Sequence, residues 1–234
     1  MSTIPTSISN QHFKIHHGPS PGITAIVYTL LFIAGIAVTI VMTNGAPFPI
    51  PYGPIETSQK YYLQFADAVR VNSFLLFGSA IPLGIYTAAV TSRLKFLGVS
   101  ATGVSISLFG GIASSVFLAI SGLCTWVLSQ PGIASNMNTM HALQLLGFAA
   151  GGVAHVVTLG LLIAGISVTS LFSNYIPKWL AWAGLILAFI SELSALSLLF
   201  PQLSLLLPVR FPAFIWLIGA GFTMVKGKPI DFKK

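Results

Sequence analysis

The side chains able to do chemistry in this sequence are polar and ionisable groups that fall inside long apolar stretches. A charge surrounded by hydrocarbon costs a few kcal/mol, so such groups are expected to face the interior of a helix bundle and to find partners there. Their clustering predicts a polar pocket that binds a small or amphipathic ligand. The candidate ligand-binding residues are Asp67, Arg70, His141, Gln144, His155, Glu192 and Arg210.

These residues match no catalytic arrangement or metal site. The sequence contains no His-Glu-x-x-His run, no Gly-x-Ser-x-Gly turn and no phosphate-binding loop. His141 and His155 have a spacing at which two histidines of one membrane helix serve different haems, but no span offers a partner histidine. We therefore predict no catalytic residue, no metal ligand and no cofactor, and favour a protein that is not an enzyme. Haem bound through His141 and His155 is the alternative.

The composition predicts where these side chains lie. Of the 234 residues, 55% are hydrophobic and 6% are charged, whereas soluble domains carry roughly 25% charged residues. So few charges cannot cover a water-facing surface. This excludes a soluble globule, a disordered chain and a nucleic-acid binder, despite the net charge of +7. The single cysteine, Cys124, excludes an intramolecular disulfide.

Six apolar stretches are long enough to cross a bilayer, whose core of about 30 Å needs about 20 helical residues. They predict an all-α fold, a polytopic transmembrane bundle of six helices over residues 23–225. The tails, residues 1–22 and 226–234, are too short for a soluble domain. The predicted spans are 23–42, 65–90, 99–128, 139–171, 179–200 and 205–225.

The distribution of Lys and Arg predicts the orientation of the bundle, because these residues accumulate on the cytoplasmic side of membrane proteins. With six spans, only Lys60, Arg70 and Arg210 fall on or near one side. We therefore predict that both termini are cytoplasmic. The residues on the cytoplasmic side are Lys14, Arg93, Lys95, Lys178, Lys226, Lys228, Lys233 and Lys234.

The depth of the ionisable residues indicates where a ligand would bind. At a rise of about 1.5 Å per residue, Glu192 and His155 lie about 20 Å from the cytoplasmic ends of their spans. Arg70 and Arg210 lie about 8 Å inside the external ends of theirs. We expect a polar pocket that opens outward, with Glu192 paired to Arg70 or Arg210, above an almost wholly apolar cytoplasmic half. Asp67 and Arg70, three positions apart, can also pair locally.

The segment 44–60 is predicted to be an external loop. Its prolines, Pro47, Pro49, Pro51 and Pro54, fix the backbone and remove hydrogen-bond donors, so an extended, stiff chain is expected rather than a helix. The loop either folds over the external mouth of the bundle as a lid or serves only as a rigid connector.

Small residues at steps of four positions predict that the third and fourth spans pack closely together. In lipid, helix association relies on close packing, which small side chains permit. The same ridges would also suit contact with a second copy or with another membrane protein. The predicted packing residues are Gly103, Ser107, Gly111, Ser115, Gly147 and Gly151.

Two motifs resemble a large group of uncharacterised bacterial multi-pass membrane proteins. One is Ile-Pro-Lys-Trp-Leu-Ala-Trp-Ala-Gly-Leu-Ile-Leu-Ala from Ile176 to Ala188, and the other is Phe-Gly-Ser-Ala-Ile-Pro-Leu-Gly-Ile from Phe77 to Ile85. The resemblance covers most of the chain in the same six-helix order. It implies a bacterial inner membrane and six spans, and it implies no activity and no catalytic residues.

Together these features predict an integral membrane protein that binds or senses, or passes, a small or amphipathic ligand in the external half of the bundle. The first alternative is an accessory or regulatory membrane subunit that acts through helix contacts, and the second is a haem- or metal-dependent membrane enzyme. The expected partners are the lipid bilayer, a small-molecule or lipid ligand, and a second copy or a membrane partner. The spans show no pair of matched interruptions at mid-depth, which disfavours active transport.

Overall fold

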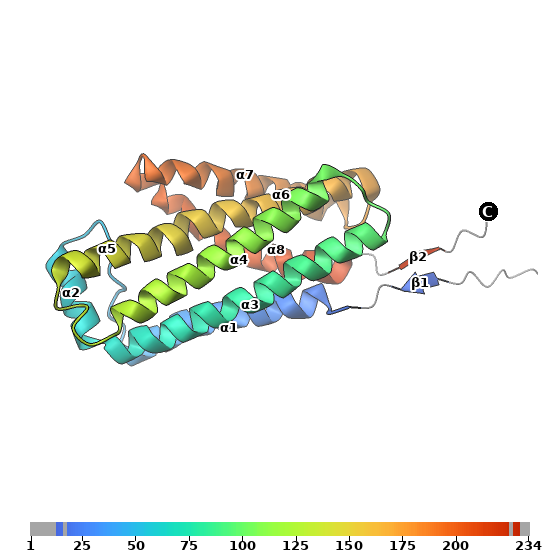
Figure 1. The fold of residues 1–234 in the computed structure, drawn as a ribbon. Helices are drawn as coiled ribbons and strands as arrows, with labels where there is room; N and C mark the ends of the chain where they lie inside the picture. Colours follow the sequence, from blue (N-terminus) through green and yellow to red (C-terminus); the bar gives the residue numbers. More distant parts are fainter. Residues whose placement is uncertain (1–12, 16–17, 225–226, 230–234) are drawn as a thin grey trace, which may run out of the picture.

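The computed structural model describes residues 13–15, 18–224 and 227–229, and this part of the chain is a helix bundle (Figure 1). Six of its helical segments are long and apolar enough to cross a membrane, which confirms the multi-pass architecture. Each overlaps one predicted span. They run over Pro21–Met42, Ala66–Phe96, Thr102–Leu128, Met137–Ser173, Lys178–Leu198 and Pro201–Thr223.

Three of these segments combine an α-helix with a stretch of π- or 3₁₀-helix, which the apolar pattern does not reveal. The fourth consists of α5 (Met137–Phe148), the π-helical η1 (Ala149–Ala154) and α6 (His155–Ser173). The fifth and sixth carry the 3₁₀ segments η2 and η3. The remaining elements are β1 (Phe13–Ile15), α1 (Pro21–Met42), α2 (Ile55–Gln64), α3 (Ala66–Phe96), α4 (Thr102–Leu128), α7 (Lys178–Leu193), η2 (Ser194–Leu198), η3 (Pro201–Val209), α8 (Arg210–Thr223) and β2 (Gly227–Pro229).

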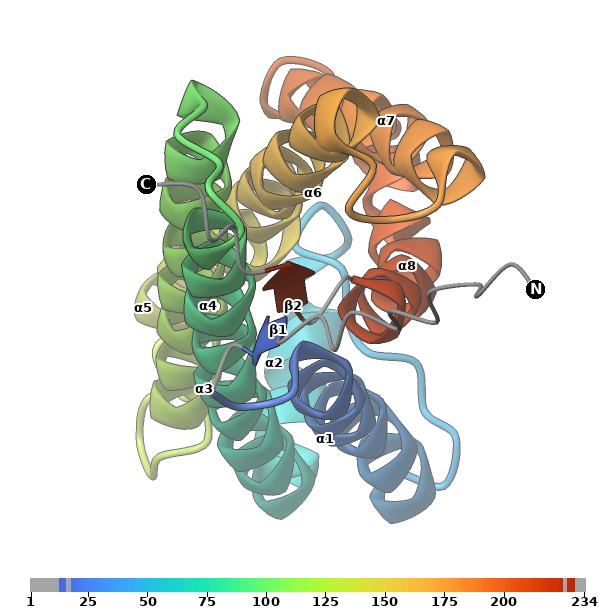
Figure 2. The same cartoon turned by 90° about the vertical axis from the view of Figure 1, so that its right-hand side faces the viewer.

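The membrane-spanning helices form a closed ring. Helix α1 packs on α3, α3 on α4, α4 on α6, α6 on α7, α7 on α8, and α8 on α1. Figure 2 shows this ring from one end, with α2 lying beyond the other helices. Strands β1 and β2 pair antiparallel at the end nearest the viewer, and we call the opposite end the α2 end. Most of the predicted tails, including Lys226, Lys233 and Lys234, lies outside the described residues.

The outer surface of the ring is apolar. Because lipid solvates apolar side chains, a membrane bundle can expose them, which a soluble protein avoids in large patches. The interior is filled by other large side chains, with Tyr28, Leu83, Leu118 and Leu162 fully buried. Strongly exposed apolar residues include Leu30, Phe74, Phe109, Phe172 and Ile215.

The small-residue ridge of α4 serves two neighbours rather than one. Gly103 lies against Gly165 of α6, as predicted, but Gly111 lies against Thr87 of α3. Ser115 also faces α3, and its hydroxyl donates a hydrogen bond to the backbone there at 2.6 Å. A step of four residues turns a helix by about 40° beyond a full circle, so the two steps from Gly103 to Gly111 carry the ridge from α6 to α3.

The fourth span packs its own small residues on α4. Gly151 lies against Ser121, and Gly147 lies against Cys124 and the Ser121 backbone. The Ser121 hydroxyl donates to the Gly147 carbonyl oxygen at 2.8 Å. The predicted contact between the third and fourth spans is therefore confirmed, and these small residues are used within one chain.

Two sequence predictions are wrong in part. Residues 44–54 lack regular structure, but the end of the predicted loop forms α2, because Pro54 sits at its N-cap and Glu56 in its first turn favours the helix start. The half of the bundle nearer the termini is not wholly apolar. Tyr86, Arg93 and Ser167 are buried there. Arg93 belongs to α3, which continues to Phe96, beyond the predicted end of the second span at residue 90.

Candidate functional site

A cavity of about 680 Å³ lies at the α2 end of the bundle. Residues of α1, α3, α4, α5, η1 and α8 form its walls, and the proline-rich loop covers it. Its volume falls within the range of small-molecule sites, roughly 300–1,000 Å³. The polar residues in its walls are Thr39, Tyr62, Asn72, Ser121, Thr125, Gln144 and Arg210.

Gln144 holds the cover of this cavity in place. Its Nε2 donates to the carbonyl oxygen of Pro49 at 3.1 Å and to the hydroxyl of Ser58 at 3.1 Å. One side chain of α5 therefore ties down both the loop and α2. The loop residues from Gly45 to Pro51 line the cavity, which matches the lid rather than the plain connector.

The other end of the Gln144 amide is unused. Its Oε1 is buried without a hydrogen-bond partner in the described part of the chain. Tyr62 of α2 also lines the cavity, and burial raises the pKa of its phenol, so it stays an uncharged hydroxyl. Gln144 and Tyr62 therefore contribute neutral polar groups to the cavity wall.

Arg210 is the only ionisable residue of an apolar span that lines the cavity among the described residues. It begins α8, where its Nε donates to the Leu207 carbonyl oxygen at 3.3 Å. One terminal nitrogen donates to the Gly151 carbonyl oxygen of η1 at 3.1 Å. The guanidinium also lies 5.8 Å from the ring centre of Phe32, a cation–π distance. Three contacts thus fix its position.

The predicted pairing of Glu192 with Arg70 or Arg210 is wrong. Glu192 lies on α7 against Gly160 of α6, and its Oε1 is buried without a partner among the described residues. No ion pair of Arg210 occurs in that part of the chain, where Asp67 pairs with Arg70. The rotation of α7 turns Glu192 toward α6 instead.

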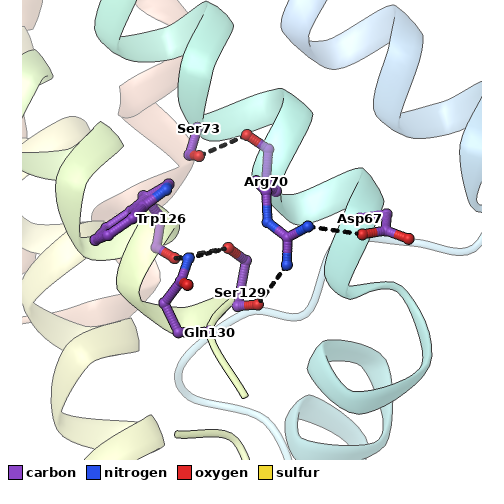
Figure 3. A network of polar contacts seen from close by, with 6 residues as sticks. All are labelled: Asp67, Arg70, Ser73, Trp126, Ser129 and Gln130. Atoms are coloured by element: carbon purple, nitrogen blue, oxygen red, sulfur yellow. Dashed lines mark hydrogen bonds and ion pairs between the residues drawn. The ribbon is translucent and has the colours of Figure 1, made fainter.

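Arg70 belongs to a separate network outside the cavity (Figure 3). It donates to Asp67 at 3.0 Å, which confirms the predicted local pair, and both side chains are exposed. It also donates to the Ser129 carbonyl oxygen at 3.3 Å and so ties α3 to the end of α4. Gln130 donates to Trp126 and Ser129 in the same network. This arrangement joins two helices and does not contribute to the cavity wall.

His155 is fully buried and does not line the cavity. Its Nδ1 lies 2.8 Å from the Ser114 hydroxyl and 3.1 Å from the Ser114 carbonyl oxygen, and its Nε2 lies 3.2 Å from the Tyr28 hydroxyl. With the proton on Nδ1, the ring donates to Ser114 while Tyr28 donates to Nε2. A neutral histidine therefore satisfies all these groups and links α1, α4 and α6.

The predicted site residues thus fall into separate places. Gln144 and Arg210 reach the cavity, whereas Asp67, Arg70, His155 and Glu192 do not. His141 is also outside it, on α5, with a buried Nδ1 that lacks a partner among the residues described. The sequence analysis missed Asn72 and Tyr62. An amide within the second apolar stretch is a visible signal for Asn72, whereas Tyr62 lies outside the apolar stretches and carries no such signal.

Comparison with protein-family models, with curated proteins and with solved structures found no match. The resemblance to bacterial multi-pass membrane proteins, which rests on residues 77–85 and 176–188, therefore remains a prediction. The geometry of the cavity is the basis on which a function can be inferred.

Replacing Gln144→Ala should loosen the lid. Two hydrogen bonds, about 1 kcal/mol each, are lost. We expect backbone amides of residues 46–60 to exchange hydrogen about 5- to 30-fold faster, as 1–2 kcal/mol implies. Hydrogen-exchange mass spectrometry measures this. Gln130→Ala is the matched control, because Gln130 bonds only within its own turn. Equal exchange in both variants would contradict the anchoring role of Gln144.

Replacing His155→Ala should destabilise the bundle. Tyr28 and Ser114 would lose their partner, at a cost of about 1–3 kcal/mol for each buried group left unsatisfied. Thermal unfolding in detergent, followed by tryptophan fluorescence, should show a clearly lower midpoint. His141→Ala, on the same span but partly exposed, should change stability by less than about 0.5 kcal/mol. Similar midpoints for the two variants would rule out the proposed helix linkage.

Proposed function

We propose that this protein binds or senses a small amphipathic ligand in the cavity at the α2 end, and that it is not an enzyme. The observation that carries the proposal is a covered cavity of about 680 Å³ whose wall combines apolar side chains with Arg210 and Gln144. Small-molecule sites typically have this composition, with a few polar groups that orient an otherwise apolar ligand.

The apolar part of the wall suits a hydrocarbon body. It is supplied from four different elements by Phe32, Ile36, Leu118, Phe148 and Phe211. Three of the seven polar residues in the wall use their hydroxyl groups elsewhere, since Thr39, Ser121 and Thr125 donate to backbone carbonyl groups. Polar recognition is therefore concentrated at a few positions.

Access to the cavity from the lipid side is the second reason to favour an amphipathic ligand. Helix α8 begins only at Arg210, so the last turns of α1 have no α8 turn beside them. Ile36, Ile40 and Phe211 line the cavity and are also 38%, 54% and 40% exposed. A molecule dissolved in the bilayer can reach the cavity between these side chains.

We further propose that both termini are cytoplasmic and that the cavity lies in the external half of a bacterial inner membrane. Lys95 and Lys178 lie at the end of the bundle opposite α2, and positive residues favour the cytoplasm. The bacterial inner membrane rests on the sequence resemblance alone.

The alternative functions have less support. The glycine ridges that would contact a partner subunit, at Gly103, Gly111 and Gly151, already pack against side chains of the same chain. Both ring nitrogens of His155 have protein partners, so this residue offers no free nitrogen to a haem iron. Ligand binding in the cavity requires no change in these helix contacts and no loss of the hydrogen bonds of His155.

The orientation can be tested with single cysteines in a Cys124→Ser background. Thr57→Cys places a thiol on exposed α2, and Ser100→Cys places one in the exposed turn between α3 and α4. A membrane-impermeant maleimide should label Thr57→Cys in intact cells and Ser100→Cys only after permeabilisation. The reverse pattern would place the cavity on the cytoplasmic side.

Ligand binding can be tested by partly filling the cavity. In nanodiscs of zwitterionic lipid, native mass spectrometry would measure retention of dodecanoate, dodecyl phosphate and dodecanol. Ile36→Trp should lower the affinity for every probe that the unmodified protein binds, by about tenfold, since overpacking costs about 1–3 kcal/mol. Ile33→Trp is the matched control, because Ile33 is similarly exposed on α1 but does not line the cavity. No binding by the unmodified protein, or equal binding by both variants, would refute the function.

A further inference from the structure

We propose that the ligand carries an anionic head group, a carboxylate or phosphate on a single apolar chain, and that Arg210 binds this group. The inference rests on the proposed function and names the chemical class of its ligand. It follows from a cation inside an apolar bundle that has no counter-charge in the described part of the protein.

The missing counter-charge is the first step. A guanidinium removed from water needs compensation by an opposite charge or by a full set of hydrogen bonds. The carboxylates of the described residues are all placed elsewhere, since Glu56 is exposed on α2, Asp67 pairs with Arg70, and Glu192 lies against α6. A ligand anion in the adjoining cavity would supply the compensation.

The geometry of Arg210 is the second step. A guanidinium has five N–H donors, and two of them are used, toward the Leu207 and Gly151 carbonyl oxygens. The three that remain have no partner among the described residues, and Arg210 lines the cavity. Because Phe32 and two carbonyl groups already hold the guanidinium, little side-chain entropy is lost on binding. Such a fixed fork of donors fits the paired oxygens of a carboxylate or phosphate.

The surroundings of Arg210 argue for an anion attached to an apolar chain rather than a free one. Phe32, Phe211 and Gly152 border the same cavity, so an ion without a chain would be desolvated against apolar surface. The unpartnered Oε1 of Gln144 would repel an anion, but Gln144 precedes Gly151 by seven residues, which is about 10 Å along the helix. The head group therefore belongs at Arg210 and the chain toward the lid and the opening between α1 and α8.

Arg210→Gln and Arg70→Gln make a matched pair for the test. Both remove one arginine near the α2 end, but only Arg210 lines the cavity. In the nanodisc assay, the unmodified protein and Arg70→Gln should retain dodecanoate and dodecyl phosphate in preference to dodecanol. Arg210→Gln should lower the affinity for both anions by about tenfold or more while leaving the affinity for dodecanol unchanged. Arg210→Lys keeps the charge and serves as the second variant if Arg210→Gln does not fold, and it should retain the preference for the anions.

The outcomes separate this inference from the proposed function. If dodecanol binds as tightly as dodecanoate and Arg210→Gln changes the affinity of neither, the cavity binds amphiphiles regardless of their charge. The inference is then wrong, while the proposed function stands. If inorganic phosphate displaces dodecyl phosphate at equal concentration, the anion alone is the ligand, which also overturns it. If no probe binds to any form, both proposals fail.

Discussion

The structure depends on one constraint, the satisfaction of polar groups inside a bundle whose outer surface faces lipid. No water is available at the interior positions of such a bundle to replace a missing partner, so each polar group needs one within the protein. Ser114, His155 and Tyr28 meet this requirement by joining three helices through one imidazole. Ser121 meets it by donating to Gly147 across the α4–α5 contact. Polar groups thereby specify which helices are neighbours, while small residues allow them to approach.

The same constraint separates structural polar groups from those available for binding. His155 has no hydrogen-bonding capacity left, whereas Arg210 keeps three donors and Gln144 keeps one acceptor. Arg210 and Gln144 line the cavity, whereas the saturated His155 does not, and the unpartnered atoms of Glu192 and His141 lie away from it. Burial alone therefore does not identify a binding residue. Unused hydrogen-bonding capacity next to an open volume is the better criterion, and it favours Arg210 over the deeper His155.

The spans were predictable because length and hydropathy determine them, and the proline-rich segment because prolines exclude a helix. The partners of the polar residues were not predictable in the same way. Helix rise gives the expected depth of Glu192 but not the direction in which α7 turns it, and in the structure it lies against Gly160 of α6. The anchoring of the lid by Gln144 joins residues far apart in the sequence, at Pro49 and Ser58, and no local pattern encodes that contact.

The π-helical segment η1 connects the packing of the bundle to the cavity. Gly147 and Gly151 were predicted as packing residues and do pack on α4, yet both also line the cavity. A larger side chain at Gly151 would collide with Ser121, so the close approach of the fourth span to α4 requires glycine there. That approach leaves the Gly151 carbonyl oxygen directed to Arg210. π-Helical turns occur often at functional sites, because they alter the regular backbone ladder. Helix packing and placement of the cation are therefore one feature, and a change at η1 would affect both.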